Sequence, residues 1–215
     1  MSARLRITEI FFSIQGESSY IGRPCVFVRL TGCDLRCSWC DTAYAFKGGR
    51  QIAIEEIVAR VESYPCNLVE ITGGEPLLQP GVHLLIKELL GRGKEVLLET
   101  GGHRDLTPVD SRVRIICDIK CPDSGMSGHN CPANLELLKP GDEIKFVLAS
   151  RADYLWAREL IRDRGLAERH TVLLSPVWDQ LEPRDLAEWI LADGLAVRMQ
   201  VQLHKILWGA EVQGV

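Results

Sequence analysis

Three cysteines stand close together in the segment TGCDLRCSWCDT, residues 31–42, with the spacing Cys33-x3-Cys37-x2-Cys40. Iron–sulfur clusters are held by thiolates, and a cube of four irons normally binds four of them. A loop that supplies only three thiolates leaves one iron without a protein ligand. An open coordination position on a metal is where a substrate or cofactor binds, as it is at catalytic zinc. The spacing therefore predicts a [4Fe–4S] cluster whose fourth iron is free to bind a small molecule.

A zinc site is the alternative for the same three cysteines, with a distant His or Cys as the fourth ligand. Structural zinc usually draws on paired Cys or His knuckles, and the sequence offers no obvious second knuckle. Incidental thiols are the remaining alternative. The cluster is the favoured interpretation.

The other five cysteines are expected to be buried or incidental thiols: Cys25, Cys66, Cys117, Cys121 and Cys131. A second metal site made by the last three of these and His129 is a less favoured alternative. The N-terminal segment has neither a long apolar stretch nor a small-residue cleavage site, so a secreted disulfide scaffold is not expected.

Composition narrows the possible partners. The 215 residues carry a net charge of −4 without a run of Lys or Arg, so there is no evident footprint for nucleic acid or for an anionic membrane. No apolar stretch approaches the roughly 20 residues that span a bilayer. We expect a cytoplasmic protein that binds neither nucleic acid nor membrane.

A second motif, Thr72-Gly73-Gly74-Glu75-Pro76, follows a predicted strand. Two glycines allow the backbone to approach a ligand closely and expose its N–H groups, while Glu75 supplies an acceptor. An ordinary turn is the alternative. Polar or aromatic residues also follow other predicted strands: Glu99, Thr100, Asp118, Lys120, Ser175 and Trp178. Because active sites of βα barrels collect at the carboxyl ends of the strands, these residues predict one shared site.

Alternating strands and helices position these motifs. Hydrophobic periodicity predicts core strands at 25–30, 68–72, 95–99, 113–118, 143–148 and 171–175, and a last strand at 196–203, with His204 continuing its alternation. It predicts helices at 54–63, 82–92, 151–164 and 183–193, and a long loop after 118 with a short helix at 133–138. Such alternation implies parallel strands joined by crossovers.

The fold class expected from this order is α/β. About six core strands are too few for an eightfold barrel, which leaves an incomplete or six-stranded barrel or an open doubly wound sheet. We predict a single domain over residues 1–215, built as an incomplete (βα) barrel with about six core parallel strands.

The cysteine motif has an aromatic residue, Trp39, directly before Cys40. This Cys-x3-Cys-x-aromatic-Cys pattern resembles the signature of radical S-adenosylmethionine (SAM) enzymes. The resemblance implies that SAM chelates the open iron and is cleaved to a 5′-deoxyadenosyl radical that abstracts hydrogen from substrate. The segment Gly73 to Glu75 resembles the family motif that binds the methionine amino group. The two motifs together are far more specific than either alone.

Further segments narrow the resemblance, namely 14–17, Arg29, 40–42, 118–122 and 202–205. Together they are similar to the 7-carboxy-7-deazaguanine synthases, over nearly the whole chain from Glu9 onward. That family contracts the ring of 6-carboxy-5,6,7,8-tetrahydropterin to 7-carboxy-7-deazaguanine with loss of ammonia, in the deazapurine pathway toward queuosine. The resemblance also implies a homodimer and an electron donor such as flavodoxin or ferredoxin.

The resemblance assigns roles residue by residue. Contacts to SAM are implied for Trp39, Cys40, Asp41, Gly73, Gly74, Glu75, Asp118, Ile119, Lys120, Ser175 and Trp178. Substrate contacts are implied for Ile14, Gln15, Gly16, Glu17, Arg29, Thr72, His204 and Val215. No catalytic residue is implied beyond the ligands of the cluster and the cofactor. In the family a terminal proline carboxylate contacts substrate, and Val215 stands at that place here.

Two implied roles have a clear physical basis. The planar fork of Arg29 suits bidentate binding of a substrate carboxylate. Thr42 is implied to bind Mg²⁺, which takes oxygen ligands and often keeps only one or two from protein. Simpler alternatives are a turn at 15–17, a surface position for Arg29, a helix-capping role for Thr42 or Asp118, and a structural His204.

Two other functions compete with this interpretation. One is a small radical enzyme that generates a glycyl radical on a partner protein, and the other is a zinc-binding interaction module. The combination of Gln15, Arg29 and Thr42 favours a small acidic substrate over a protein partner.

Overall fold

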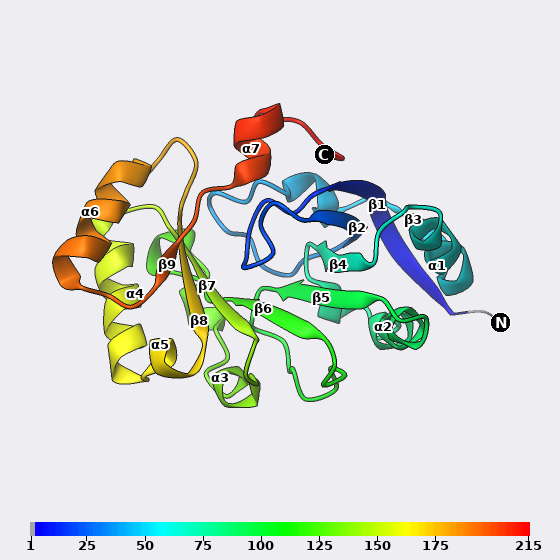
Figure 1. Cartoon of the computed structure of the whole chain (residues 1–215), viewed down its shortest axis with the longest axis horizontal. Helices are drawn as coiled ribbons and strands as arrows, with labels where there is room; N and C mark the ends of the chain where they lie inside the picture. Colours follow the sequence, from blue (N-terminus) through cyan, green and yellow to red (C-terminus); the bar gives the residue numbers. More distant parts are fainter. Residues whose placement is uncertain (1–2) are drawn as a thin grey trace.

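A computed structural model describes residues 3–215 and contains one curved, open sheet with helices on its outer side (Figure 1). The strand order is β3-β1-β2-β4-β5-β6-β7-β8-β9. The strands are β1 (Arg4–Ile14), β2 (Pro24–Leu30), β3 (Arg50–Ala53), β4 (Leu68–Gly73), β5 (Glu95–Thr100), β6 (Arg114–Asp118), β7 (Glu143–Leu148), β8 (Thr171–Pro176) and β9 (Arg198–Met199).

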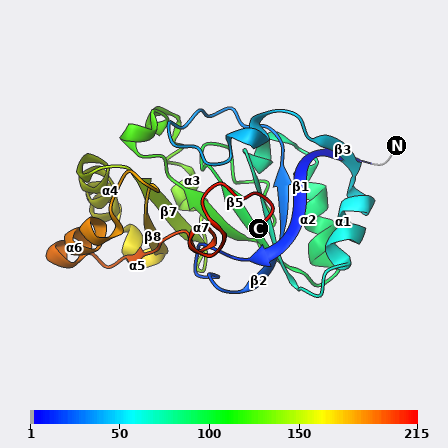
Figure 2. The ribbon, with the colours of Figure 1, turned by 90° about the horizontal axis from the view of Figure 1, so that it is seen from above.

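All of the helices except the last, α7, cover one face of this sheet. They are α1 (Ile54–Glu62), α2 (Val82–Gly91), α3 (Asn134–Leu137), α4 (Arg151–Asp163), α5 (Leu166–Arg169), α6 (Pro183–Asp193) and α7 (Leu203–Trp208). Viewed from above, α1 and α2 lie at one end of the sheet and α4 to α6 at the other (Figure 2). The C-terminal segment lies over the middle of the molecule, close to the inner side of the sheet. None of the helices in the described residues is long and apolar enough to cross a membrane.

Two hydrophobic clusters lie on opposite faces of the strands, because successive side chains of a strand point to opposite sides. Val26 and Val28 of β2 belong to the large cluster under the helices. Cys25 and Phe27 of the same strand belong to a small cluster on the inner face, with Leu68, Leu97 and Ile116. Above this small cluster the inner-facing positions become polar near the carboxyl ends of the strands. The alternation therefore turns one end of the inner face into a polar site.

The predicted fold class is confirmed. The six predicted core strands all form parallel neighbours, from β2 to β8, and the sheet does not close into a barrel. The helices predicted at 54–63, 82–92, 151–164 and 183–193 are present with ends shifted by at most one residue. The short helix expected at 133–138 is α3. Two antiparallel strands, β1 and β3, were not predicted and extend the sheet beyond β2.

The strand predicted at 196–203 is wrong over most of its length. Only β9 pairs with β8, and its ladder ends where the Gln200 amide donates to the Leu174 carbonyl. The chain then leaves the sheet, and the Leu203 amide donates to the carbonyl of Gly16, 3.0 Å away. His204 accordingly lies on helix α7 and not on a strand. The cause is a tertiary contact that local alternation does not encode.

Candidate active site

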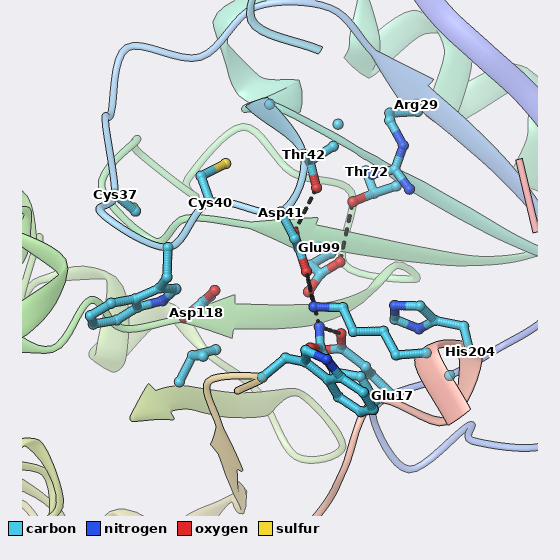
Figure 3. A pocket seen from close by; sticks show the side chains of 18 of the residues that line it. Glu17, Arg29, Cys37, Cys40, Asp41, Thr42, Thr72, Glu99, Asp118 and His204 are labelled. Atoms are coloured by element: carbon cyan, nitrogen blue, oxygen red, sulfur yellow. Dashed lines mark hydrogen bonds and ion pairs between the residues drawn. The ribbon is translucent and has the colours of Figure 1, made fainter. Parts of the chain in front are cut away.

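A cavity of about 650 Å³ opens at the carboxyl ends of the parallel strands (Figure 3). It brings together most of the residues predicted from sequence: Ile14, Gln15, Gly16, Glu17, Arg29, Cys33, Cys37, Trp39, Cys40, Asp41, Thr42, Thr72, Gly73, Gly74, Glu75, Asp118, Lys120, Trp178, His204 and Val215. Two predicted residues are not part of its wall. Ile119 and Ser175 are both buried and lie outside the cavity lining.

The cysteine loop has the properties that a cluster requires. Cys33, Cys37 and Cys40 are free, none of them is fully buried, and all three line the cavity. Burial raises the pKa of each thiol, and a coordinating metal removes the proton outright. The loop is fixed by its own chain, because Arg36 donates to the Cys33 carbonyl at 2.7 Å. These residues fit a cluster held by three thiolates.

The long segment after β6 supports this loop from outside the cavity. The amide of Ser38 donates to the Ser124 carbonyl at 3.1 Å, and the Ser38 hydroxyl donates to the Asp123 carbonyl at 2.8 Å. The Asp123 amide in turn donates to Asp153, a fully buried carboxylate at the start of α4. The long loop predicted after residue 118 therefore holds the cysteine loop in place.

The two glycines of the second motif fit closely against the cysteine loop. A Cβ on Gly74 would collide with the carbonyl of Gly32 and lie 2.8 Å from the Cβ of Cys33. Gly73 has φ +149°, and a Cβ there would collide with the Leu30 carbonyl. We interpreted these glycines as allowing approach to a ligand, and the structure shows that Gly74 also leaves room for the cysteine loop and Gly73 for the end of β2. They set the distance between the two motifs.

Glu75 is fully buried, and its carboxylate is occupied by donors of its own chain. It accepts hydrogen bonds from the Leu77 amide at 3.0 Å, the Thr100 hydroxyl at 2.9 Å and the Gly101 amide at 2.8 Å. The carboxylate thus joins the end of β4 to the end of β5. The contact of Glu75 with SAM stays a prediction. In the structure the side chain holds the ends of β4 and β5 together.

The floor of the cavity is a charged network centred on Lys145, which the sequence analysis did not identify. Its ammonium contacts Glu17 at 2.8 Å, is in direct contact with Glu99, and lies 3.8 Å from Asp118. Burial alone would lower the pKa of Lys145, but the charges of Glu17 and Glu99 raise it well above its usual range. Burial acts to raise the pKa of Glu17, and Lys145 outweighs it and lowers that pKa. Both groups are therefore charged.

Asp118 is poised to bind a ligand. One carboxylate oxygen, Oδ2, accepts from Lys120 at 2.8 Å. The other, Oδ1, is buried and has no hydrogen-bond partner among residues 3–215. No backbone group within the described chain donates to this carboxylate, so the capping alternative is not what the structure shows. Because buried polar atoms are normally hydrogen-bonded, we expect a bound molecule to donate a hydrogen bond to Oδ1 of Asp118.

Helix α7 and the residues before it close one side of the cavity. Gln202 donates to Glu17 at 2.8 Å and to Asp41 at 3.2 Å, and Lys205 donates to Asp41 at 2.8 Å. A Cβ on Gly16 would collide with the His204 ring, so these two predicted substrate residues touch each other. Burial lowers the pKa of His204, which favours a neutral imidazole.

Arg29 is a half-buried cavity residue, which excludes the surface-strand alternative. Its Nε donates to Glu9 Oε1 at 2.7 Å, and the hydroxyl of Tyr44 donates to the same oxygen at 2.8 Å. The two terminal nitrogens make no hydrogen bond with any residue from 3 to 215. The guanidinium is thus oriented by one edge while the other stays available for a carboxylate. Glu9 and Tyr44 were not predicted, because only long-range pairing brings them to Arg29.

Thr42 does not cap the short 3₁₀ helix that follows it, Ala43–Phe46, because its side chain makes no hydrogen bond to the first turn. Its hydroxyl donates to Asp41 Oδ1 at 2.9 Å, which leaves oxygen lone pairs to bind a cation. Elsewhere, Cys25, Cys117 and Cys121 are fully buried, as expected, whereas Cys66 and Cys131 are half-buried.

Comparison with known proteins defines the class first. Residues 27–130 match the family model described as the Radical SAM superfamily. The fold is that of QueE from Escherichia coli, whose crystal structure superposes with a TM-score of 0.78 at 23% identity, covering 94% of this chain and 95% of that one. The protein is a radical SAM enzyme, and its cofactors are a [4Fe–4S] cluster and SAM.

Relatives with higher sequence identity define the family. The 7-carboxy-7-deazaguanine synthase of Chlorobaculum tepidum is 52% identical, covering 99% of this chain and 98% of the relative. The enzyme of the same name from Koribacter versatilis is 48% identical, covering 98% of this chain and all of the relative. The chain belongs to the 7-carboxy-7-deazaguanine synthase family.

Proposed function

We propose that this protein converts 6-carboxy-5,6,7,8-tetrahydropterin to 7-carboxy-7-deazaguanine with release of ammonia. The observation that carries the proposal is one cavity that contains both the cysteine loop and the free edge of Arg29. A radical made at the cluster acts only on a molecule held beside it, and the Arg29 fork selects a carboxylated one. Family membership supplies the particular reaction.

The chain divides the binding work between two sides of the cavity. Cys33, Cys37 and Cys40 would hold the cluster, which when reduced would supply the electron for reductive cleavage of SAM. SAM would be bound beside them by residues 39–41, 73–75 and 118–120, with Trp178 and Ser175. The unpaired Oδ1 of Asp118 supports this placement because it needs a donor from a ligand. The protein's own task is to orient the two molecules and exclude water.

The substrate lies on the opposite side, against residues 14–17, with its carboxylate on Arg29. Thr72 and His204 complete the contacts, and Val215 borders the same space. Thr42 would bind a magnesium ion, with water and substrate as further ligands, which suits the few protein ligands that magnesium keeps. A homodimer and a small electron-carrier protein, flavodoxin or ferredoxin, are part of the same proposal.

Anaerobic turnover of the reconstituted enzyme with the pterin, SAM and dithionite tests the assignment. The expected product is 7-carboxy-7-deazaguanine, with one ammonia per turnover and with SAM regenerated. A pterin labelled with deuterium at C6 is expected to transfer label into 5′-deoxyadenosine, which an activase acting on a partner protein would not do. Cleavage of SAM without any deazaguanine product would refute the proposed substrate and leave the radical chemistry intact.

A further inference from the structure

The cavity floor holds more carboxyl groups than its cations can neutralise. Glu17 and Glu99 both contact Lys145, while Asp118 has its own partner in Lys120. A further carboxyl group, that of Glu70, lies in the same floor and contacts neither lysine through a salt bridge. Two carboxylates already share the ammonium of Lys145. A third negative charge beside them would have no counterion of its own.

Glu70 lies on β4, two residues before Thr72, so both side chains face the inner side of the sheet. It is only 4% exposed, yet it forms part of the cavity wall. Burying a carboxylate without a cation or several donors is costly, whereas the neutral acid is tolerated. The burial of Glu70 without a cation therefore favours the protonated form of its carboxyl group.

The charged groups around Glu70 act in the same direction. Burial and the nearby charges of Glu99 and Glu17 raise the pKa of Glu70 well above its usual range. Lys145 on β7 and Arg29 on β2 oppose this shift and are outweighed. Cys25 on β2, also close by, is itself a neutral buried thiol because burial raises its pKa.

The hydrogen bonds around Glu70 indicate where its proton lies. The amide nitrogen of Gln15 donates to Oε2 of Glu70. The amide oxygen of Gln15 is engaged as well, because it accepts from the Glu17 backbone at 3.1 Å. Oε2 is therefore an acceptor, and Oε1 has no partner among residues 3–215. The proton belongs on Oε1, the oxygen left free for a molecule in the cavity.

We propose that Glu70 is a neutral carboxylic acid in the resting enzyme and donates a hydrogen bond from Oε1 to an acceptor atom of the substrate heterocycle. The identity of the heterocycle rests on the proposed function, whereas the protonation state does not. A reduced pterin offers ring nitrogen and carbonyl acceptors that a carboxylate would repel. A carboxylic acid kept neutral by its surroundings so that it can donate is an established device in enzyme sites.

Infrared spectroscopy of the full-length reconstituted enzyme tests the protonation state without turnover. Protein labelled with ¹³C-glutamate is compared with Glu70→Gln at neutral pH. The difference spectrum is expected to contain the carbonyl stretch of one protonated carboxylic acid, which is distinct from carboxylate bands. Glu95→Gln is the matched control, because Glu95 lies on β5 at the exposed opposite end of the inner face, paired with Arg23, and is expected to show only carboxylate bands. Absence of the acid band in the Glu70 difference spectrum overturns the proposal.

Substrate binding tests the donor role. Glutamine keeps a neutral donor at position 70, so Glu70→Gln is expected to bind the pterin within about threefold of wild type. Glu70→Ala is expected to bind it roughly tenfold or more weakly, as loss of one buried hydrogen bond implies. Binding by wild type is expected to weaken as pH rises through the pKa of Glu70, and Glu70→Gln to lack this decline. Equal weakening in Gln and Ala variants whose iron content matches wild type would overturn the donor role. If wild type binds no pterin, the proposed function fails while the infrared result still stands.

Discussion

His103 Nε2 lies 2.7 Å from Oδ1 of Asp34, the residue that directly follows Cys33. Arg104 contacts the other oxygen of the same carboxylate. On its far side, Nδ1 of His103 is 3.8 Å from the buried carboxylate of Glu75. The His103 side chain therefore links the cysteine loop to the Gly-Gly-Glu motif, two segments that must keep a fixed separation if both contact one cofactor.

Replacing His103 by Ala is expected to loosen the cysteine loop and to cost about 1 kcal/mol of stability, the usual value of one hydrogen bond. The specific readout is the electron paramagnetic resonance spectrum of the reduced cluster with SAM, which is expected to broaden. Arg112→Ala serves as the control, because it removes an exposed pair with Asp110 away from the cavity. An unchanged spectrum in His103→Ala would assign the residue no positioning role.

Gly74→Ala is expected to abolish SAM binding and lower the iron content, because its methyl group would collide with the backbone of the cysteine loop. Equilibrium dialysis with SAM and iron analysis measure the two effects. Gly91→Ala is the matched control, since a Cβ at the end of α2 meets nothing within 4 Å. That variant is expected to be unchanged or more stable by about 0.4–1 kcal/mol. Normal SAM affinity in Gly74→Ala would contradict the close fit between the two motifs.

Arg29→Lys keeps the charge but loses the planar fork, so we expect KM for the pterin to rise about tenfold and the KM for SAM to stay constant. Steady-state kinetics with each substrate varied in turn measures both. Arg23→Lys provides the comparison, because Arg23 pairs with Glu95 away from the cavity and is expected to leave both constants unchanged. A rise in the KM for SAM alone would indicate that Arg29 contacts SAM and not the pterin.

Lys205→Met is expected to remove a pH-dependent part of the stability. Burial acts to raise the pKa of Asp41, but Lys205 outweighs it and holds this pKa below its usual range. A lowered carboxyl pKa stabilises the fold above the unfolded value of about 3.9 and the contribution is lost as pH falls below it. The Asp41 side chain is 45% exposed, so the effect at neutral pH should be only about 0.5–1 kcal/mol.

Urea unfolding from neutral pH down to about pH 3 measures this difference, which should shrink toward the acid end. Arg184→Met is the control, because it breaks a largely exposed pair with Glu188 and should change little at any pH. A wild-type advantage that grows as pH falls would contradict the pairing.

The parallel core strands and the motif residues could be predicted from the sequence, because apolar runs and motif spacings are both visible within a few consecutive residues. The six core strands carry their own apolar runs, and each motif residue lies where such a run ends. Glu70 and Lys145 were missed, although each lies two residues before a cavity residue on its own strand. Residues two apart on a strand face the same side, so the known cavity residues could have pointed to them. Because these strands are buried on both faces, however, their sequences do not show which face lines the cavity.

Other parts of the site depend on contacts between distant segments. Glu9 reaches Arg29 only through the antiparallel pairing of β1 with β2, which has a register shift between Ile7 and Glu9. Helix α7 forms where the chain meets Gly16, and its first residues continue a strand-like pattern in the sequence. No local rule predicts either contact.

The wall that α7 contributes has a consequence for biosynthesis. Residues 202–205 bind Glu17, which follows β1, and Asp41 of the cysteine loop, so a late segment of the chain closes the cavity against two early ones. On a translating ribosome the three cysteines emerge long before this wall exists. The substrate chamber is therefore enclosed only after residue 205 has been released. We therefore expect a cluster to be inserted into the loop more readily before residues 202–205 dock than after they have docked.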